Sequence, residues 1–384
     1  MSQINFLQKV RIDRAQIDTL FPSLKKRGYS LIGPKISDGA IIYDYLDSIE
    51  ELPIGWTDEQ EAGTYRIKQR GDQALFGYSL GPHSWKKFLF PARKKVWQGQ
   101  KTSDGNFKTI QEIATQSQRF AFIGVRACEL HAIHIQDQVF MNKQYQDAEY
   151  THKRTDNFIV AVNCGQAGKT CFCSSLNTGP KVSQGYDLVL TEIIDDATHY
   201  FVVESGSERG LEVLHELSFE SVSNSDLEAV ERCIENAIGQ MSRAIDTTDI
   251  KEFLYRNYDN KRWQELEKRC LTCANCTMVC PTCFCSKVED TTDLTGDYAE
   301  RWQTWDSCFT MDFSYIHGGS VRVSTQSRYR QWLVHKLASW IDQFGTSGCV
   351  GCGRCITWCP VGIDLTEEVK ALRLAEWEAI NGKS

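Results

Sequence analysis

Two copies of one cysteine pattern lie in the last third of this 384-residue chain, and they constrain its fold more than any other feature. Each copy reads C-x2-C-x2-C-x3-C-P. The first copy consists of Cys270, Cys273, Cys276 and Cys280, followed by Pro281. The second copy consists of Cys349, Cys352, Cys355 and Cys359, followed by Pro360. This spacing is typical of a protein that holds two [4Fe–4S] clusters.

In two-cluster proteins with this spacing, the fourth cysteine of each run binds the cluster of the other run. We therefore expect one cluster on Cys270, Cys273, Cys276 and Cys359. We expect the other cluster on Cys349, Cys352, Cys355 and Cys280. Paired C-x2-C knuckles also bind tetrahedral zinc, but zinc sites rarely contain three cysteines at this spacing followed by x3-C-P. The repeated pattern favours two neighbouring redox centres that carry electrons.

Four cysteines upstream suggest a third site. Cys128 follows an apolar run at 120–125, and Cys164, Cys171 and Cys173 follow a second apolar run at 158–162. If both runs are strands of an open α/β sheet, these thiols lie at the edge where such sheets bind ligands. We expect them to converge on a third [4Fe–4S] cluster, with zinc as the chemical alternative. A set of buried apolar thiols is the structural alternative.

The remaining cysteines do not follow a ligand spacing. Cys283 and Cys285 come directly after the first run, and Cys308 lies further along the chain. They could be S–H donors beside a cluster, alternative ligands or core residues, and we interpret them as core residues or donors. Cys233 falls on a predicted helix and is interpreted as structural.

The composition limits the class of protein. The chain has 16 cysteines and a net charge of −7, which argues against nucleic acid as the main partner. No run of 18 apolar residues is present, so no membrane span is expected. The N-terminal sequence MSQINFLQKVRIDRAQ lacks the apolar segment of a secretory signal. Many cysteines without such a signal predict metal ligation in the cytoplasm rather than disulfide bonds.

The pattern of apolar residues predicts the order of the domains. Residues 1–225 are expected to form a mixed α/β (α+β) domain that contains the third site. Its predicted elements alternate as strand, helix and strands, at 120–125, 129–140, 158–162, 186–190 and 199–204. A helical connector is expected at 226–269, and a mainly α-helical, ferredoxin-like dicluster domain at 270–384. The helical assignment rests on the long separation of the two cysteine runs and on helical patterns at 327–342 and 366–380.

Two basic features could act on a cluster. The stretch from His83 to Lys95 is rich in lysine and aromatic residues within an acidic chain. A solvated face is the simple interpretation, while a docking surface or a lining for a negatively charged cluster is the functional one. Arg126 precedes Cys128 by two residues and is predicted to contact the cofactor there. Positive charge near a cluster raises its reduction potential.

The sequence offers no catalytic residues. It contains no G-x-G-x-x-G after a strand and no phosphate-binding P-loop. The cysteine pairs of a nickel–iron centre, a sirohaem pattern and a Ser–His–Asp set are also missing. His131 and His134 lie on a predicted helix, where packing is the simpler interpretation.

Several segments together resemble a known family. They are KKFLFPARKKVW, FIGVRACELHAI, NCGQAGKTCFCSSLNTGP, CANCTMVCPTCFC, RWQTWDSC and GCVGCGRCITWCPVGIDL. In this order they resemble the iron–sulfur beta subunit of cytoplasmic NAD(P)-linked nickel–iron hydrogenases (sulfhydrogenases), which is similar to the iron–sulfur subunit of anaerobic sulfite reductase. The resemblance covers residues 28–365 and includes all eight cysteines of the two runs. It also includes Cys128 and the 164–173 segment, although Ala127 stands where the family commonly has proline.

The resemblance implies an electron-transfer subunit of a larger complex. A partner subunit would carry FAD and exchange electrons with NAD(P)H. Small iron–sulfur and catalytic subunits, with nickel–iron or sirohaem, would receive the electrons. Two rival hypotheses remain: a self-contained oxidoreductase with a site at the Cys128/Cys164 edge, and an iron–sulfur redox sensor. The acidic chain lacks a DNA-binding motif, which counts against the sensor.

Overall fold

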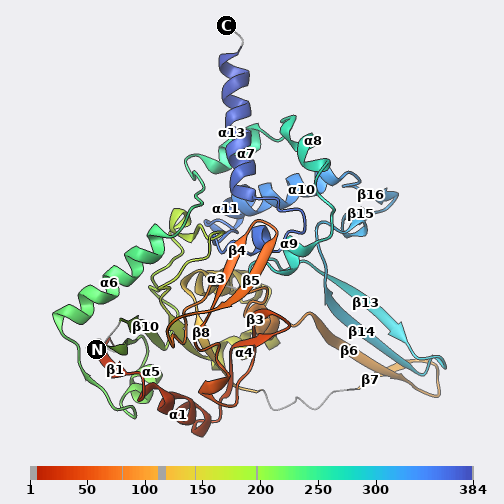
Figure 1. Cartoon of the computed structure of the whole chain (residues 1–384). Coiled ribbons are helices and arrows are strands. Elements are labelled where there is room, and N and C mark those ends of the chain that lie inside the picture. Colours follow the sequence, from red (N-terminus) through yellow and green to blue (C-terminus); the bar gives the residue numbers. More distant parts are fainter. Residues whose placement is uncertain (1–6, 80, 111–117, 143, 196–197, 383–384) are drawn as a thin grey trace.

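The computed structural model describes residues 7–79, 81–110, 118–142, 144–195 and 198–382. The first six residues of the N-terminal segment, for which no secretory signal is predicted, lie outside this part. The chain forms an α/β body from which a small sheet and the C-terminal helix project (Figure 1). Within the described ranges, no helix combines the length and apolar character needed to cross a membrane.

The body is built on an eight-stranded sheet. Its strand order is β12 (Glu220–Ser221), β1 (Lys9–Asp13), β11 (His199–Ser205), β10 (Leu188–Ile194), β9 (Phe158–Val162), β8 (Phe120–Val125), β2 (Ser30–Ser37) and β3 (Ala40–Tyr45). The central strands β10, β9, β8 and β2 are parallel, and the outer strands pair antiparallel. The predicted strand–helix–strand unit is confirmed, because β8 and β9 are adjacent and parallel.

Both faces of the central strands are covered, which explains their sequence. Every residue of β8 and β9 is buried, as expected for parallel strands between two helical layers. Ile123 faces the side covered by α1 (Leu20–Lys26) and α5 (Glu208–Leu214). Phe122 faces the side covered by α3 (Ala127–Phe140). The predicted strands at 186–190 and 199–204 correspond to β10 and β11 with shifted ends.

A second, four-stranded sheet joins distant parts of the chain. Its order is β13 (Ser286–Thr292), β14 (Tyr298–Trp305), β6 (Arg93–Lys101) and β7 (Phe107–Thr109). The segment between the two cysteine runs therefore contains a β-hairpin, and a mainly helical dicluster domain is not confirmed. The local sequence pattern does not predict this hairpin, because β14 also pairs with β6, which lies nearly two hundred residues earlier in the sequence. Arg93 lies over the Trp302 ring at 4.1 Å and supports that pairing.

Helices form most of the remaining structure. The predicted helical connector 226–269 overlaps α6 (Asn224–Gly239) and contains α7 (Ile250–Arg256) and α8 (Arg262–Glu267). The helical patterns after it correspond to α10 (Thr325–Val334), a π-helical turn η5 (His335–Ser339), α11 (Trp340–Phe344) and α13 (Leu365–Asn381). Phe253, Trp263, Trp332 and Leu372 form a shared apolar core between these helices. The predicted domain limits stay predictions.

The shorter elements connect these layers. The helices are α2 (Lys86–Leu89), α4 (Ala148–Asp156), α9 (Asn275–Met278) and α12 (Arg354–Thr357). The strands are β4 (Trp56–Glu61), β5 (Thr64–Gln69), β15 (Tyr315–Ile316) and β16 (Gly319–Ser320). The β4–β5 hairpin lies against the second cysteine run, where Gly63 donates its N–H to the Ile356 carbonyl at 3.1 Å.

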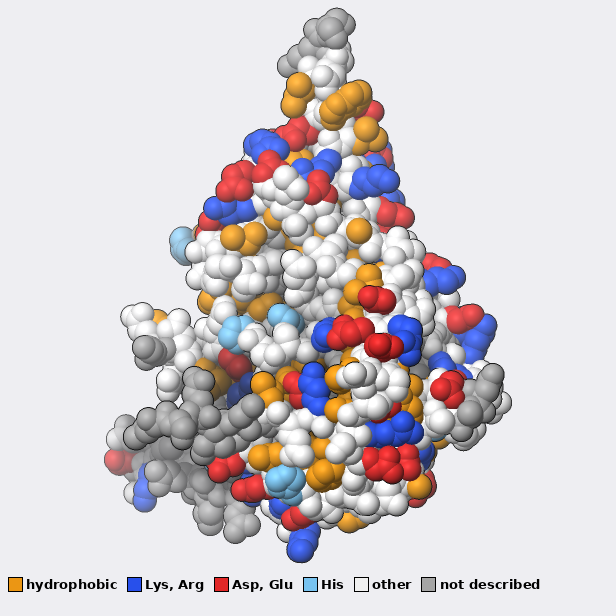
Figure 2. Space-filling view, turned by 90° about the vertical axis from the view of Figure 1, so that its left-hand side faces the viewer, with side chains coloured by type: hydrophobic (Ala, Val, Ile, Leu, Met, Phe, Trp, Pro, Cys, Tyr) orange, Lys and Arg blue, Asp and Glu red, His pale blue; other side chains and the backbone are white. Residues whose placement is uncertain are grey.

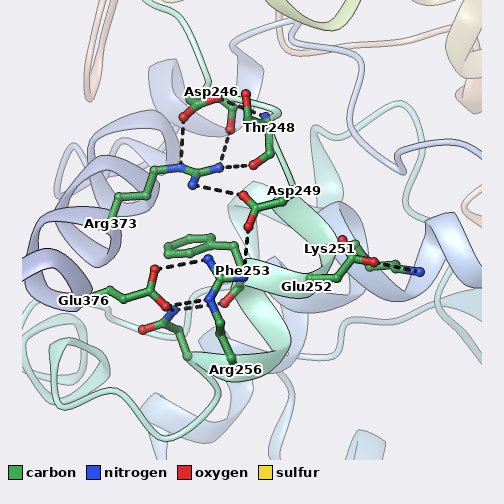
Figure 3. A network of polar contacts seen from close by, with 10 residues as sticks. Asp246, Thr248, Asp249, Lys251, Glu252, Phe253, Arg256, Arg373 and Glu376 are labelled. Carbon is green, nitrogen blue, oxygen red and sulfur yellow. Dashed lines mark hydrogen bonds and ion pairs between the residues drawn. The ribbon is translucent and has the colours of Figure 1, made fainter. Parts of the chain in front are cut away.

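A polar network holds the base of α13 against α7 (Figure 3). Arg373 donates to the carbonyl oxygens of Asp246 at 3.1 Å and Thr248 at 2.5 Å. Arg256 donates to Glu376 at 2.7 Å. Exposed pairs of this kind contribute little individually to stability. Together they join the base of α13 to α7 and to the loop that precedes it.

The far half of α13 presents apolar side chains to solvent. Figure 2 shows hydrophobic side chains close to the end of this projecting helix. The exposed side chains on α13 are Leu374, Trp377 and Ile380. An exposed apolar patch on a helix is typical of a contact site for another protein.

A buried ion pair connects the sheet to the second cysteine run. The Arg354 guanidinium donates to Glu129 at 2.6 Å, and both side chains are fully buried. Glu129 also accepts hydrogen bonds from the Tyr43 hydroxyl at 2.7 Å and the Trp85 indole at 3.0 Å. Arg354 donates further to the carbonyl oxygen of His83 at 2.7 Å. Each charge therefore has several partners, as buried charges require.

We expect Glu129→Gln to destabilise the fold by about 3–5 kcal/mol, because it leaves the Arg354 charge buried without a counter-ion. Urea unfolding of the anaerobic protein, followed by tryptophan fluorescence, measures this change. Glu252→Gln is the control, since Glu252 pairs with Lys251 on the exposed surface and its loss should leave the free energy of unfolding unchanged. Equal effects of the two substitutions would contradict the prediction.

Candidate metal centres

The first cysteine run forms a tight loop between α8 and α9. Thr272 and Ala274 both adopt left-handed backbone conformations, with φ of 52° and 68°. These turns let successive thiols face the same side, which a continuous helix or strand would not allow. The Thr272 N–H points at the Cys270 sulfur at 3.4 Å. The loop thus offers both thiols and a backbone donor to one centre.

Five thiols from the two runs line one pocket: Cys270, Cys273, Cys276, Cys355 and Cys359. We call Cys270, Cys273, Cys276 and Cys359 the first thiol set, because the sequence predicts that these four hold one cluster. Apolar side chains complete the lining, including Phe309, Trp332 and Ile363. Burial, followed by the charges of Cys270, Cys359 and Cys273, raises the pKa of Cys276 well above its ordinary value. A thiol-lined apolar pocket fits a [4Fe–4S] cluster. The assignment of these four thiols to that cluster stays a prediction.

The second run repeats the loop with glycines at the turning positions. Gly351 and Gly353 have φ of 63° and 74°. A Cβ at Gly351 would lie 2.6 Å from the Cys173 backbone, and a Cβ at Gly353 would lie 2.4 Å from the Thr170 carbonyl oxygen. Glycine is required at both positions because the backbone of the upstream cysteine segment approaches this loop directly.

The second thiol set comprises Cys280, Cys349, Cys352 and Cys355. Burial raises the pKa of Cys355 well above its usual range, and Cys349, Cys352 and Cys280 are close enough to raise it further. Cys276 of the first set also acts on Cys355, so the two sets are neighbours. Their role as ligands stays a prediction.

The upstream cysteines converge as well, and we call them the third thiol set: Cys128, Cys164, Cys171 and Cys173. Cys128 lies in the first turn of α3, which follows β8, and Cys164 follows β9. Burial raises the pKa of Cys128 well above its ordinary value, with further contributions from Cys173, Cys352 and Cys164. The third set therefore lies beside Cys352 of the second set, at the carboxyl ends of two parallel strands.

Arg126 lies next to the third set and is buried. Its guanidinium donates to the carbonyl oxygens of Phe76 and Tyr78, both at 2.9 Å. Burial raises the pKa of the Cys164 thiol, and the Arg126 charge opposes that rise. Arg126 therefore supplies positive charge at the predicted place.

The basic stretch divides into an inner and an outer part. Lys86 is buried, with its ammonium 4.0 Å from the centre of the Trp305 ring and 3.1 Å from the Cys283 carbonyl oxygen. Lys94 and Lys95 instead form surface ion pairs, Lys94 with Asp147 and Lys95 with Glu300. The first half of the stretch is therefore largely buried, with Lys86 close to the thiols, and only its second half reaches the surface.

The cysteines without a ligand spacing lie close to the second set. Cys285 and Cys308 interact at the base of the β13–β14 hairpin, and Cys283 interacts with Cys280. Contact with the Cys308 thiol, which outweighs burial, lowers the pKa of Cys285 to about 7. Cys233 is separate from them and lies beside Gly165, next to the third set. His131 and His134 are on α3 and form no cluster with the thiols that the structure describes.

Sequence reasoning missed Lys336, a buried lysine in the π-helical turn η5. Its ammonium donates to the Cys280 sulfur at 3.1 Å and to the Thr282 hydroxyl at 2.9 Å. Burial alone would lower the pKa of Lys336, but the Cys280, Cys283 and Cys349 charges raise it well above its ordinary value. The only sign of this role in the sequence is a lysine within a helical segment rich in Trp and Leu. The sequence does not show that Lys336 faces the thiols, because its orientation depends on the π-helical turn.

Mononuclear metal sites were the alternative for these thiols. Among the residues described, no group of three or more His, Cys, Asp or Glu side chains is arranged to hold a single metal ion.

Comparison with known proteins agrees with this arrangement. Residues 269–363 match the family of 4Fe–4S dicluster domains. The matched segment includes both cysteine runs and the residues between them. Together with the thiol-lined pocket, this match supports an iron–sulfur protein. The chain is similar to the beta subunit of sulfhydrogenase 2 from Pyrococcus furiosus, with 29% identity over 334 residues that cover 86% of this chain and 94% of the relative. The resemblance to iron–sulfur beta subunits of sulfhydrogenases is confirmed.

In the iron-free chain at pH 8, we expect iodoacetamide to modify Cys273 well before Cys171. Cys273 is exposed, whereas Cys171 is buried and its burial raises its pKa to about 11. Only the thiolate reacts, so the rate at Cys171 should rise about tenfold per pH unit until the pH approaches that pKa. Mass spectrometry of tryptic peptides measures both rates. Equal rates at pH 8 would contradict the burial of Cys171.

Proposed function

We propose that this chain is an electron-transfer subunit that relays electrons through [4Fe–4S] clusters. The electrons would pass between a flavin subunit that uses NAD(P)H and a terminal catalytic subunit. The observation that carries the proposal is the adjacency of the thiol sets: Cys355 of the second set lines the same pocket as the four cysteines of the first set. Clusters that share chain segments in this way form a path for single electrons. The relative's name, a sulfhydrogenase subunit, supports the same role.

The ligands in this proposal are the thiol sets themselves. The first cluster would be held by Cys270, Cys273, Cys276 and Cys359. The second would be held by Cys280, Cys349, Cys352 and Cys355. The third would be held by Cys128, Cys164, Cys171 and Cys173. The clusters supply the one-electron chemistry, and the chain holds the ligands, excludes water and sets the surrounding charge.

The chain's own residues suggest where electrons enter or leave. Cys273 of the first set is exposed, and the neighbouring Leu271 and Val361 are exposed apolar side chains. A partner that covers these residues would bring its own redox centre close to the first cluster. The apolar end of α13 offers a second contact for a partner.

A self-contained oxidoreductase is the second candidate. A polar hollow lies beside the third set, lined by Asn163, Gln166, Glu192 and Cys233 among others. A substrate bound there would be next to Cys164. This hollow is the observation that favours the rival function.

We expect the lone chain to accept electrons from dithionite but not from NAD(P)H, because its sequence contains no dinucleotide-binding fingerprint. Visible absorption of the anaerobic protein around the cluster bands measures the reduction. NAD(P)H oxidation by the purified chain at a catalytic rate would contradict the relay and favour the second candidate. Neighbouring reading frames that encode a nickel–iron or a sirohaem subunit would identify the terminal acceptor.

The anaerobic protein should contain about twelve irons per chain, because three sets of four thiols would each hold four irons. The double substitution Cys171→Ser with Cys173→Ser should lower the content to about eight irons. Cys233→Ser is the matched control, since Cys233 is a partly buried thiol outside the three sets and should leave the iron content unchanged. A content of about eight in the unaltered chain would restrict the relay to two clusters.

A further inference from the structure

The second thiol set is in contact with an ammonium group that has no carboxylate partner. Lys336 is only 6% exposed. Its three donors reach the Cys280 sulfur at 3.1 Å, the Thr282 hydroxyl at 2.9 Å and the Gly348 carbonyl oxygen at 3.4 Å. In the part of the chain that the structure describes, no Asp or Glu forms an ion pair with Lys336. Cys280 is the one partner of these three that can carry a negative charge.

The position of Lys336 depends on an irregular helix. The chain runs from α10 through the π-helical turn η5 into α11, and Lys336 is the second residue of that turn. A π-helical turn adds one residue to the helical repeat, and such turns occur frequently at functional sites. Neighbouring residues Leu337 and Ala338 are also buried, so the turn packs a charged and two apolar side chains into the interior. This packing holds the ammonium against Cys280.

A buried ammonium is costly unless a negative charge balances it. The thiolates of a metal-bound second set would supply that charge, with Cys280 in direct hydrogen-bond contact. Two other cations lie near this set: Arg354, which acts on Cys352, and Lys86, which acts on Cys280 and Cys283. The Arg354 charge is balanced by Glu129, so Lys336 and Lys86 supply the positive charge around the second set.

The first set lacks such a donor. Its sulfur atoms receive backbone N–H groups, from Thr272 to Cys270 at 3.4 Å and from Ile363 to Cys359 at 3.3 Å. Among the described residues, no lysine or arginine donates a hydrogen bond to a sulfur of the first set. Arg328 is buried and its charge acts on Cys270, but its guanidinium donates to the Phe309 carbonyl oxygen rather than to a sulfur. The two sets thus differ in whether a cation donates directly to a ligand sulfur, although their loops are alike.

We infer that Lys336 is a positioning residue that raises the reduction potential of the cluster held by Cys280. A hydrogen bond and a positive charge at a ligand sulfur both stabilise the reduced, more negative cluster. Electrons that enter at the first set would then move to the second set with a favourable change in free energy. This inference rests on the proposed electron-relay function and adds a direction to the step between the two clusters.

The test is an anaerobic redox titration of the full chain, monitored by EPR. In the Lys336→Met variant, the reduction potential of one cluster should fall by at least about 59 mV. This corresponds to a tenfold change in the reduction equilibrium of a one-electron couple. The other potentials and the iron content should stay unchanged. Lys336→Arg retains the charge and should keep the potential near that of the unaltered chain. Lys251→Met is the matched control, because Lys251 lies on the surface and pairs with Asp342.

Unchanged potentials in a Lys336→Met protein that retains its iron would overturn the inference and leave the relay intact. An equal fall in the Arg variant would also overturn it, because the charge would then not be the cause. If the Met variant loses iron, Lys336→Gln replaces it in the same comparison, since glutamine keeps an N–H donor without the charge. A chain that binds no clusters at all would instead contradict the proposed function.

Discussion

The buried ion pair between Glu129 and Arg354 determines how the two halves of this protein meet. Glu129 follows Cys128 directly, and Arg354 lies between Cys352 and Cys355. One interaction of 2.6 Å therefore aligns the first turn of α3 with the second cysteine loop. Gly351 and Gly353 allow the backbone at Thr170 and Cys173 to approach the same loop closely. The second and third thiol sets are neighbours because of these contacts.

Charge balance explains which residues surround the thiols. Burial disfavours the thiolate, and it raises the pKa of Cys128, Cys276 and Cys355 well above the ordinary value. Metal binding needs the thiolate, so nearby positive charge makes ligation easier. Arg126 and Lys336 supply such charge next to the third and second sets. The same cations would also make the clusters easier to reduce, so one arrangement serves both ligation and electron transfer.

The elements that the sequence predicted correctly depend on local patterns. The run at 120–125 is continuously apolar because it is buried on both faces, and this can be seen without a structure. The hairpin of β13 and β14 was not predicted, because its residues are mostly polar and exposed and its partner β6 belongs to a distant segment. The sequence also left undecided whether Lys86 is buried. Its ammonium packs against Trp305, which belongs to that distant hairpin.

The sequence by itself determined the chemistry of the site. The spacing of two cysteine runs requires tight loops with converging thiols, and ligand spacing is a local property of the chain. Only the tertiary structure decided the order of the thiol sets and the charge around each of them. Contacts such as Lys336 with Cys280 join residues 56 positions apart, and that closeness arises from how helices and loops pack. The chain's cysteine pattern thus specifies which cofactor can bind, while the packing around it sets how that cofactor is tuned.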